Sequence, residues 1–521
     1  MGMVAPQQRI ASAYFVIFGN YGDVTRYAEE RGVCRQWVYR EAGWLQDFLA
    51  AKQAQAEALE QRVQELQQKN LALEERLAVS VVLDEDTQAQ LAAVGQANGV
   101  SLPAVWEFLD VLIPGKQLSV ATLGRRSKAA AGKSGQLLPI FDEFARERVR
   151  DVAADELYVN DPVRMVVEQE SLCWISGRLG ETVDGEGWAE EFRQLPKLEQ
   201  VARDGGKGLQ KGVALVNTER QEHGQPLVVD KGDHFHALRG GGVGMRRVQK
   251  QAAKALAEAE QAQQELQECQ KQGEQRTQGA GKHAATAWRK AEKAMDLWCE
   301  RERLWQQTKE AMRLVTPTGE LNTRQHAEAV LAQTLPQLPD SAFAKTKRQI
   351  DKPEMLNYLD HVHQQIEVLP FPEEVKQAAV RQECLRRRPE ALQGQNTQAA
   401  ARRGILLTCA VILGKTGAVG EQAVTAVRDI LRRAYRASSL VECINSAVRM
   451  HQCRHRKMTQ GLLDLKRLYW NCHTFRTGHR RGTTPYQRLG VPWPEGLRWW
   501  DVLKLTPEQL RDKLSTAKTP P

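Results

Sequence analysis

Strand-like runs occupy one stretch of this chain, and helical patterns fill the rest of it. After the glycine cluster RGGGVG (239–244) the strand pattern does not return. Strands that alternate with a helix predict an α/β domain. We therefore expect an α/β core that a large all-helical insertion interrupts. The strand-like runs are 151–159, 163–177, 212–219 and 226–238, and a helical stretch at 185–195 separates the second from the third.

The expected fold class is multidomain, α and α/β. A chain of 521 residues is long enough for several domains and a sizeable core. The changes of pattern predict a helix-turn-helix-like unit at 1–43, a coiled coil or long helix at 44–80, a second helical unit at 81–145, the first part of the core at 146–240, the helical insertion at 241–430, the last part of the core at 431–495 and a C-terminal tail at 496–521.

Two apolar patterns inside the insertion carry specific expectations. Charged helical residues run through 246–312 with a break at 278–282, which predicts an antiparallel helical hairpin. The longest apolar run is 404–414. It is too short for a membrane span of roughly 18 residues and predicts a buried helix.

Residues 9–42 have the pattern of a helix-turn-helix. Gly32 supplies the turn, and the second helix begins with exposed basic and aromatic side chains. Such a helix can enter the major groove of DNA. A helical hairpin that only packs on its neighbour is the alternative. The candidate DNA contacts are Arg35, Gln36, Tyr39 and Arg40.

Residues 44–80 carry leucines and a valine at spacings of three, four and seven. This suits a coiled coil and hence dimerisation. A lone amphipathic helix packed inside the monomer is the competing interpretation. The positions are Leu59, Val63, Leu66, Leu73 and Leu77.

The second helical unit contains a helix start and a basic segment. Ser101 begins a helix with Pro103 just inside it. The segment 124–135 is basic and rich in small residues, so we expect it to be flexible and to contact a DNA backbone. Gly132-Lys133-Ser134 resembles the end of a phosphate-binding loop but lacks the upstream glycine and the preceding strand.

Composition favours a soluble chain with a polyanionic partner. Lys+Arg number 73 against 64 Asp+Glu, a net charge of +9, and Arg is concentrated at 381–403 and 428–488. A positive bias favours nucleic acid, although a solvated basic surface is the alternative. Nine cysteines without regular spacing do not suggest a disulfide framework. We expect no signal peptide, no membrane span and a cytoplasmic, nucleoid-associated location.

Three acidic residues stand in three different local settings. Asp155 lies in the apolar stretch VRDVAADELYV, Asp204 follows KLEQVAR, and Glu442 sits in the helical pattern SSLVECINSAVRM. A strand, its neighbour and a helix laid across the sheet can bring three carboxylates together. Such a set can hold two Mg²⁺ ions, or Mn²⁺, for phosphoryl transfer. Glu168 or Glu170 could replace the first acid, and Asp230 or Asp233 the second; for any one of them a solvated or capping role is the alternative.

Basic residues surround two of these acids. Lys207 follows Asp204 after two glycines that let a nucleic acid backbone approach. Phosphate positioning is the natural use of the remaining cations, and a solvated basic face is the alternative. They are Arg449, Arg454, His455, Arg456 and Lys457 beyond Glu442, and Arg476, Arg480 and Arg481 in the tail that follows.

Other candidates carry weaker signals. On a strand, His234 and His236 would face the same side and could touch substrate or metal, but a structural histidine pair is the favoured interpretation. Trp288, Trp298 and Trp305 are expected in a helix core. A zinc site is disfavoured because the spacing matches no finger pattern; its residues would be Cys453, His455, Cys472 and His473.

The motifs ADELYV, ARDGGKGL, KGDHFHAL and SSLVECINSAVR, with the tail LYWNCHTFRTGHRRGTTPYQRLGV, resemble those of a DDE transposase of a bacterial insertion sequence. That family has a retroviral-integrase-like (ribonuclease H-like) catalytic domain. The resemblance covers roughly 150–240 and 430–495. The gap between Asp204 and Glu442 departs from the short spacing common in that superfamily, although some transposases carry a helical insertion before the last acid.

The resemblance implies a function. Asp155, Asp204 and Glu442 would be the catalytic, metal-binding residues, and Asn445 would match the asparagine of the final catalytic helix and contact DNA. The enzyme would cleave and join double-stranded DNA at the ends of a mobile element, as a homo-oligomer and without a covalent intermediate. One alternative is a DNA-binding regulatory or architectural protein with an inactive core. Another is a ribonuclease or resolvase of the same fold.

Overall fold

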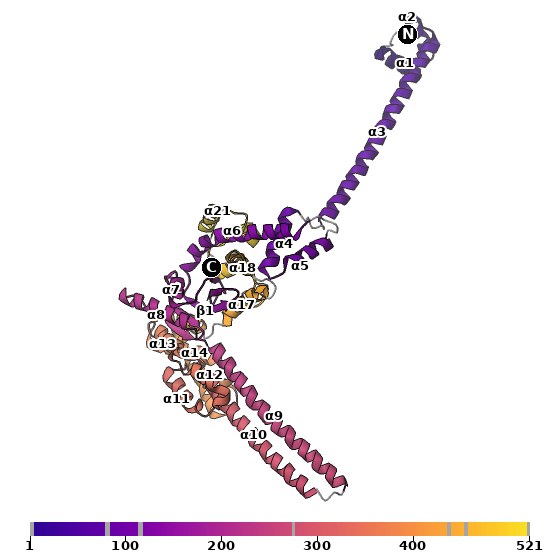
Figure 1. Cartoon of the computed structure of the whole chain (residues 1–521). Helices are drawn as coiled ribbons and strands as arrows, with labels where there is room; N and C mark the ends of the chain where they lie inside the picture. The colour runs from indigo at the N-terminus through magenta and orange to yellow at the C-terminus, as the bar shows by residue number, and fades with distance from the viewer. Residues whose placement is uncertain are drawn as a thin grey trace. The chain divides into compact units, whose positions relative to one another are not determined.

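The computed structural model describes residues 5–78, 84–112, 118–272, 277–434, 439–452 and 457–517. The chain forms two compact units, residues 1–87 and 88–521. Figure 1 gives the labels of the helices and strands.

The first unit consists of three helices. α1 (Pro6–Phe18) and α2 (Asp23–Arg31) pack against the start of α3 (Arg35–Ala78). Gly32 ends α2 with a φ of 65°, a left-handed conformation that favours glycine, so the turn falls where the sequence predicts it. α3 is one unbroken helix, so the expected boundary between 43 and 44 falls inside it.

The next helices along the chain are α4 (Glu85–Ala97), whose first three residues fall in the first unit, α5 (Leu102–Leu112) and α6 (Val120–Arg146). The Ser101 hydroxyl accepts a hydrogen bond from the backbone N–H of Ala104 at 3.3 Å, as expected of a helix start. The expectation of a flexible segment at 124–135 is wrong, because these residues lie inside α6. The buried Ser134 hydroxyl donates to the Ala130 carbonyl at 2.8 Å and is not available to a phosphate.

Five strands form one mixed sheet in the order β3-β2-β1-β4-β5. β2 is antiparallel to β1 and β3, whereas β1, β4 and β5 run parallel to one another. This confirms an α/β unit within a mostly helical chain. The strands are β1 (Asp151–Tyr158), β2 (Pro162–Glu168), β3 (Trp174–Leu179), β4 (Gln200–Arg203) and β5 (Val229–Gly232).

Three of the four expected strand runs differ from the structure. The run 163–177 is divided into β2 and β3, and residues 169–173 between them belong to no strand. The run 212–219 lies in α8 (Lys207–Glu222), where Leu209, Val213 and Val216 are buried at helical spacing. The run 226–238 yields only the short β5, because a helix begins at His234. The expected helix at 185–195 is α7 (Gly185–Arg193).

The two faces of β1 pack into different cores. Val152 and Ala154 point into a core shared with α6, α7 and α8. Ala153 and Leu157 point to the other face, which α17 (Ser439–Gln452) covers. This period of two decides which acidic side chains of the strand meet α17.

The end of the chain completes the first of these cores. α18 (Gln460–Cys472) packs on α6, and the short helices α19 (Pro485–Arg488) and α20 (Trp499–Val502) follow it. Leu510 and Leu514 of α21 (Pro507–Thr516) are fully buried in the same core. Most of the segment expected to be a C-terminal tail therefore belongs to the folded unit.

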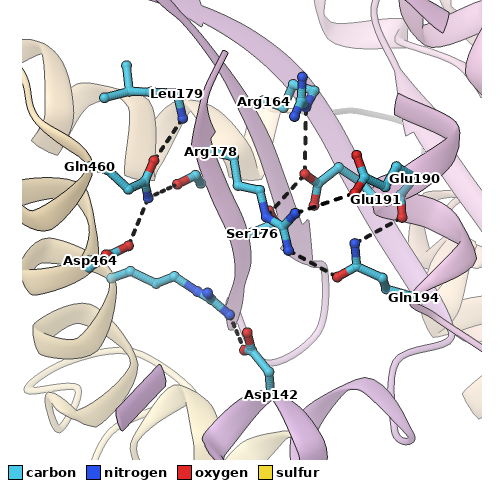
Figure 2. Close-up of polar contacts among 12 residues, drawn as sticks. Asp142, Arg164, Ser176, Arg178, Leu179, Glu190, Glu191, Gln194, Gln460 and Asp464 are labelled. Carbon is cyan, nitrogen blue, oxygen red and sulfur yellow. Dashed lines mark hydrogen bonds and ion pairs between the residues drawn. The ribbon is translucent and has the colours of Figure 1, made fainter. Parts of the chain in front are cut away.

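Buried polar contacts fasten α7 to the sheet (Figure 2). The Glu191 carboxylate is 3% exposed and lies between Arg164 of β2 at 3.6 Å and Arg178 of β3 at 3.5 Å. A buried carboxylate needs such partners, because leaving it unpaired would be costly. The network fixes the helix that precedes β4.

A second set of contacts in Figure 2 joins α18 to the edge strand β3. Gln460 accepts from the backbone N–H of Leu179 at 2.9 Å and donates to the Gly177 carbonyl at 3.0 Å. Arg467 forms a buried ion pair with Asp142 of α6. Segments about 280 residues apart in sequence therefore pack as one core, as expected of a domain with an insertion.

The insertion is helical apart from a bridge between Val315 and Leu321 among the described residues. Its own core is formed by the ends of α9 and α10 and the helices after them. The helices are α9 (His234–Gln272), α10 (Thr277–Ala311), α11 (Arg324–Thr334), α12 (Asp340–Ile350), η1 (Pro353–Met355), α13 (Asn357–Glu367), α14 (Glu373–Arg387), η2 (Pro389–Leu392), α15 (Thr397–Lys415) and α16 (Ala418–Arg433).

α9 and α10 pack side by side as the expected hairpin (Figure 1). The expected break at 278–282 is wrong, since those residues lie in α10. The glycine cluster at 239–244 is not a break either, because it lies inside α9. A Cβ at Gly241 would come within 2.1 Å of the Trp305 ring, so glycine allows close packing there.

The expected burial of 404–414 is also wrong in part. The segment is helical, in α15, but only Cys409 and Leu413 are buried in it, and Leu407 is 69% exposed. Trp305 is buried in the insertion core as expected, and Trp298 packs against that core. Among the described residues, no helix is both long enough and apolar enough to cross a membrane.

Candidate functional site

Asp155 and Asp204 lie side by side where the pairing of two neighbouring parallel strands ends. Ala154 of β1 pairs in register with Arg203 of β4, and the two aspartates are the next residues along. Strands that run parallel and in register carry successive residues to the same level, so the two carboxylates are neighbours. The sequence assigned one acid to a strand and one to its neighbour, and the structure has that arrangement.

α17 carries the third acid, Glu442, near enough for its charge to act on Asp155. Asp155 lies on the face of β1 that this helix covers, and Asn445 of α17 is fully buried there. The Asn445 Nδ2 donates to Asp155 Oδ2 at 2.7 Å. Glu442 precedes Asn445 by three residues, about one helical turn.

Electrostatics link the three carboxylates. Burial is the main cause that raises the pKa of Asp155 from 3.8 to about 7, and the negative charges of Asp204 and then Glu442 contribute to that rise. The backbone N–H of Glu156, which donates to Asp155 Oδ1 at 2.9 Å, and the charge of His236 lower the pKa in part. The raised pKa of Asp155 therefore reflects burial first and the two neighbouring negative charges second.

Glu442 has a cationic partner of its own. Arg449, two turns further along α17, donates to Glu442 Oε2 at 2.7 Å. The pair is partly exposed, so it is readily exchanged for other partners. The charge of Glu442 thus helps to raise the pKa of Asp155 although Arg449 forms an ion pair with the Glu442 carboxylate.

The donor set fits a hard divalent cation in part. Asp155 and Asp204 offer carboxylate oxygens, and Asn445 Oδ1 is a buried acceptor with no hydrogen-bond donor among the described residues. Oxygen ligands and uncompensated negative charge suit Mg²⁺. Yet no group of three His, Cys, Asp or Glu side chains in the described ranges is close enough together to hold a metal ion.

A third parallel strand ends beside this pair. Asp233 follows β5, and its carboxylate forms an ion pair with the His236 Nδ1. This hydrogen bond, together with the charges of Asp233, Asp155 and Asp204, raises the pKa of His236. The expectation that His234 and His236 share one side of a strand is wrong. Both belong to α9, and the buried His234 contacts the Met355 carbonyl through its Nε2 at 2.7 Å.

The insertion also reaches the candidate site. Lys352 precedes η1, and its Nζ would lie 3.4 Å from a Cβ placed at Gly205, next to Asp204. Glu354 of η1 accepts from the buried Arg203 at 3.2 Å. A shallow hollow is lined by these residues together with Asp233 and His236. Sequence reasoning missed this contact, because nothing in a helical pattern indicates which turn will lie against a distant strand.

The alternative acids have other partners. Glu168 is buried and accepts backbone N–H groups of the turn between β2 and β3. Glu170 pairs with Arg432 at 3.0 Å. Asp230 forms a two-pronged ion pair with Arg203, at 2.8 and 2.6 Å. The structure therefore groups Asp155, and not Glu168 or Glu170, with Asp204.

Two expected DNA contacts are placed where DNA cannot use them freely. Asn445 is fully buried and serves Asp155. Arg480 is half-buried and donates to the Glu170 carbonyl at 2.9 Å. The Asn445 amide and the Arg480 guanidinium therefore both make hydrogen bonds within the protein itself. Asn445 thus orients Asp155, and the DNA contacts of Asn445 and Arg480 stay predictions.

The remaining candidates for DNA contact are exposed. Lys207 is the first residue of α8, where the helix dipole adds positive character beside Asp204. The side chains of His451 and Cys453 to Arg456, which include Arg454 and His455, lie outside the described residues. The exposed candidates are Arg35, Gln36, Tyr39, Arg40, Lys207, Arg449, Lys457, Arg476 and Arg481.

Comparison with known proteins adds no relative. No family model matches the chain, and no curated protein or solved structure matches it. The fold defines a multidomain, mostly helical protein with one mixed five-stranded sheet, and the site defines a cluster of acidic side chains where the pairing of its parallel strands β1 and β4 ends.

Proposed function

We propose that the protein is a transposase of the DDE kind, which cleaves DNA at the ends of a mobile element and joins it to a target. One observation carries the proposal. Asp155, Asp204 and Glu442 come from a central strand, its neighbour and a helix more than 200 residues away, and the charges of Asp204 and Glu442 both raise the pKa of Asp155. Carboxylates gathered from separate elements are what two-metal phosphoryl transfer requires.

The sheet supports the same proposal. A ribonuclease H-like core, which the sequence resemblance implies, has a five-stranded mixed sheet with β1 in the centre and the second strand reversed. The order β3-β2-β1-β4-β5 with an antiparallel β2 is compatible with such a core. The acids then lie where β4 ends beside β1.

Each residue has a defined task in this proposal. Bound Mg²⁺ or Mn²⁺ would activate the attacking hydroxyl and stabilise the leaving oxygen. Asp155, Asp204 and Glu442 would hold the ions, and the Asn445 amide keeps the Asp155 carboxylate in one orientation. Lys207 and Arg449 would contact phosphates. An Arg449 that turned to a DNA phosphate would leave the Glu442 carboxylate free to hold an ion together with Asp155 and Asp204.

The exposed start of α3 gives the protein a surface for recognising DNA. Arg35, Gln36, Tyr39 and Arg40 occupy its first two turns, and Tyr39 is 49% exposed. In a helix-turn-helix these positions contact base edges and phosphates. The transposase would thus act on DNA of the nucleoid, as an oligomer that brings two element ends together.

The triad is tested by single substitutions to alanine. The substrate is duplex DNA that carries the sequences flanking the coding region, with Mg²⁺ or Mn²⁺ present. Asp155→Ala, Asp204→Ala and Glu442→Ala should each lower strand cleavage by at least about a thousandfold, since each removes a ligand for the ions. DNA affinity, measured by gel shift, should change by less than about threefold.

Asp161→Ala is the matched control. It removes an exposed carboxylate from the turn that follows β1, and it should cleave at the wild-type rate. If Asp204→Ala or Glu442→Ala cleaves as fast as this control, the proposed function is refuted.

A second candidate is a DNA-binding regulatory protein with an inactive core. The Glu442–Arg449 ion pair favours it, because a paired Glu442 is not free to bind a metal ion. Tight binding of the flanking DNA, with no cleavage at any Mg²⁺ or Mn²⁺ concentration, would support this candidate over the transposase.

A further inference from the structure

The second half of α3 has an apolar stripe that nothing in its unit covers. Every side chain from 46 to 76 is exposed. Four large apolar side chains at coiled-coil spacing are among them: Leu59 is 60% exposed, Val63 50%, Leu66 48% and Leu73 59%. Figure 1 draws this part of α3 as a lone helix beyond α1 and α2. The side chain of Leu77 lies outside the described residues.

The spacing assigns these residues to a heptad. Leu59, Leu66 and Leu73 are seven residues apart and occupy the d position, whereas Val63 and Asn70 occupy the a position. A β-branched residue at a with leucine at d is the combination that favours two parallel strands. The stripe therefore fits a second copy of the same helix.

Asn70 adds a requirement for register. In a paired coil an asparagine at an a position is buried, and its amide needs a hydrogen-bonding partner. The partner at the same level of an in-register parallel dimer is the second Asn70. Asparagine at this position thus selects two strands in register at some cost in stability.

Charges beside the stripe decide between parallel and antiparallel pairing. An antiparallel coil places g opposite g and e opposite e, so it would set like charges against each other along both sides. A parallel coil places g opposite e of the next heptad, which sets Lys69 against Glu74 of the other copy. The e positions are Glu60, Gln67 and Glu74, and the g positions are Arg62, Lys69 and Arg76.

We propose that α3 forms a parallel, in-register, two-stranded coiled coil with α3 of a second copy of this chain. Leu59, Val63, Leu66 and Leu73 form its apolar contact, Asn70 fixes its register, and Lys69 with Glu74 fixes its direction. Arg62 contributes less to direction, because it already pairs with Glu65 of its own helix at 2.9 Å.

The dimer has a consequence for DNA binding. Both α2–α3 turns lie at the same end of a parallel coil, so two exposed recognition surfaces are presented together. Two joined surfaces bind two half-sites far more tightly than either surface alone, if their spacing matches the DNA. The proposed dimer does not depend on the proposed function. Only its role in DNA binding rests on that function.

The apolar contact is tested with the full-length protein in the absence of DNA. Sedimentation equilibrium should give a dimer. Leu66→Ala should raise its dissociation constant by at least about tenfold, because each copy loses a d side chain. Leu71→Ala is the matched control, since Leu71 is 59% exposed at a b position, away from the contact. A monomer at about 50 µM, a trimer, or equal effects of the two variants would overturn the proposal.

The direction is tested by exchanging charges. Lys69→Glu places two acidic side chains opposite each other in a parallel dimer, and it should raise the dissociation constant by about tenfold at low salt. The double variant Lys69→Glu with Glu74→Lys should restore the wild-type value. Glu75→Lys, at the outward f position, is the control and should have little effect.

An antiparallel dimer predicts the opposite result. There Lys69→Glu would introduce an acid among basic g positions and tighten the dimer, and that outcome would overturn the proposed direction. Strand cleavage has no part in either experiment. Failure of the coiled coil and failure of the proposed transposase activity are therefore distinguishable.

Discussion

At the scale of single residues, the protonation of Asp155 sets how stability depends on pH. Its pKa rises from 3.8 to about 7 on folding, so the folded state holds this proton more tightly than the unfolded chain does. Stability should fall as pH rises from about 4 to about 7, and above about pH 7 the cost of the buried charge is fully present.

Asp155→Asn should remove that dependence. The variant should be more stable than wild type by up to about 4 kcal/mol near pH 8, and the difference should shrink toward about pH 5. Urea unfolding in the presence of a chelator measures it. Adding Mg²⁺ near pH 8 should stabilise wild type and leave Asp155→Asn unchanged. A stability difference that is the same at every pH would contradict the assignment of the shift to Asp155.

The sequence identified the acids of the site and not their surroundings. Asp155 stands in a recognisable apolar run and Glu442 on a recognisable helix face, whereas Asp204 follows β4, a strand that the sequence did not predict. Asn445 was expected at the DNA, yet it is buried against Asp155. Whether Asn445 is buried depends on which side of α17 faces the sheet. Neighbouring residues of a helix point in different directions, so a small rotation of the helix would expose a different residue.

At the scale of secondary-structure elements, the sequence failed where two patterns overlap. The run at 212–219 is rich in β-branched residues, which suggests a strand. The spacing of Leu209, Val213 and Val216 is that of a helix face, and packing on the sheet selected the helix. β4 is only four residues long and gives no measurable period. Sheet pairing with β1 and β5, which a single sequence does not show, makes it a strand.

The glycine cluster in α9 gives a matched pair of substitutions. Gly241→Ala should destabilise the protein by about 1–3 kcal/mol, because the added methyl group meets the buried Trp305 ring. Gly242→Ala should be neutral or stabilise by up to about 1 kcal/mol, because its nearest neighbour is the tip of Arg246 at 4.0 Å and alanine favours a helix. Thermal unfolding compares the two, and equal changes would mean that α9 does not approach Trp305 so closely.

At the scale of the whole second unit, two distant parts of the chain have to meet. The sheet is complete by residue 232, and α17 begins at 439. A closed loop of this length costs little more entropy than a shorter one, because the cost grows only with the logarithm of loop length. The sequence indicated a divided core because 146–240 and 431–495 each have the pattern expected of a part of that core. It could not show which contacts close it.

One of those closing contacts is Arg433, at the end of the last helix of the insertion. It donates to the carboxylate of Asp151, the first residue of β1, at 2.8 Å and to Glu199 at 2.7 Å. Asp151 is 3% exposed. Arg433→Ala leaves that buried carboxylate without its guanidinium and should lower the free energy of unfolding by about 3–5 kcal/mol.

The neighbouring Arg432 separates this effect from a general loss of positive charge. Arg432 pairs with Glu170 at 3.0 Å, and both side chains are substantially exposed. Arg432→Ala should cost no more than about 1 kcal/mol, as exposed ion pairs do. Urea unfolding of the two variants compares the buried ion pair between Arg433 and Asp151 with the exposed ion pair between Arg432 and Glu170. A similar loss in both would show that the end of the insertion is not anchored through Asp151, and that α17 is brought to the sheet by its own packing alone.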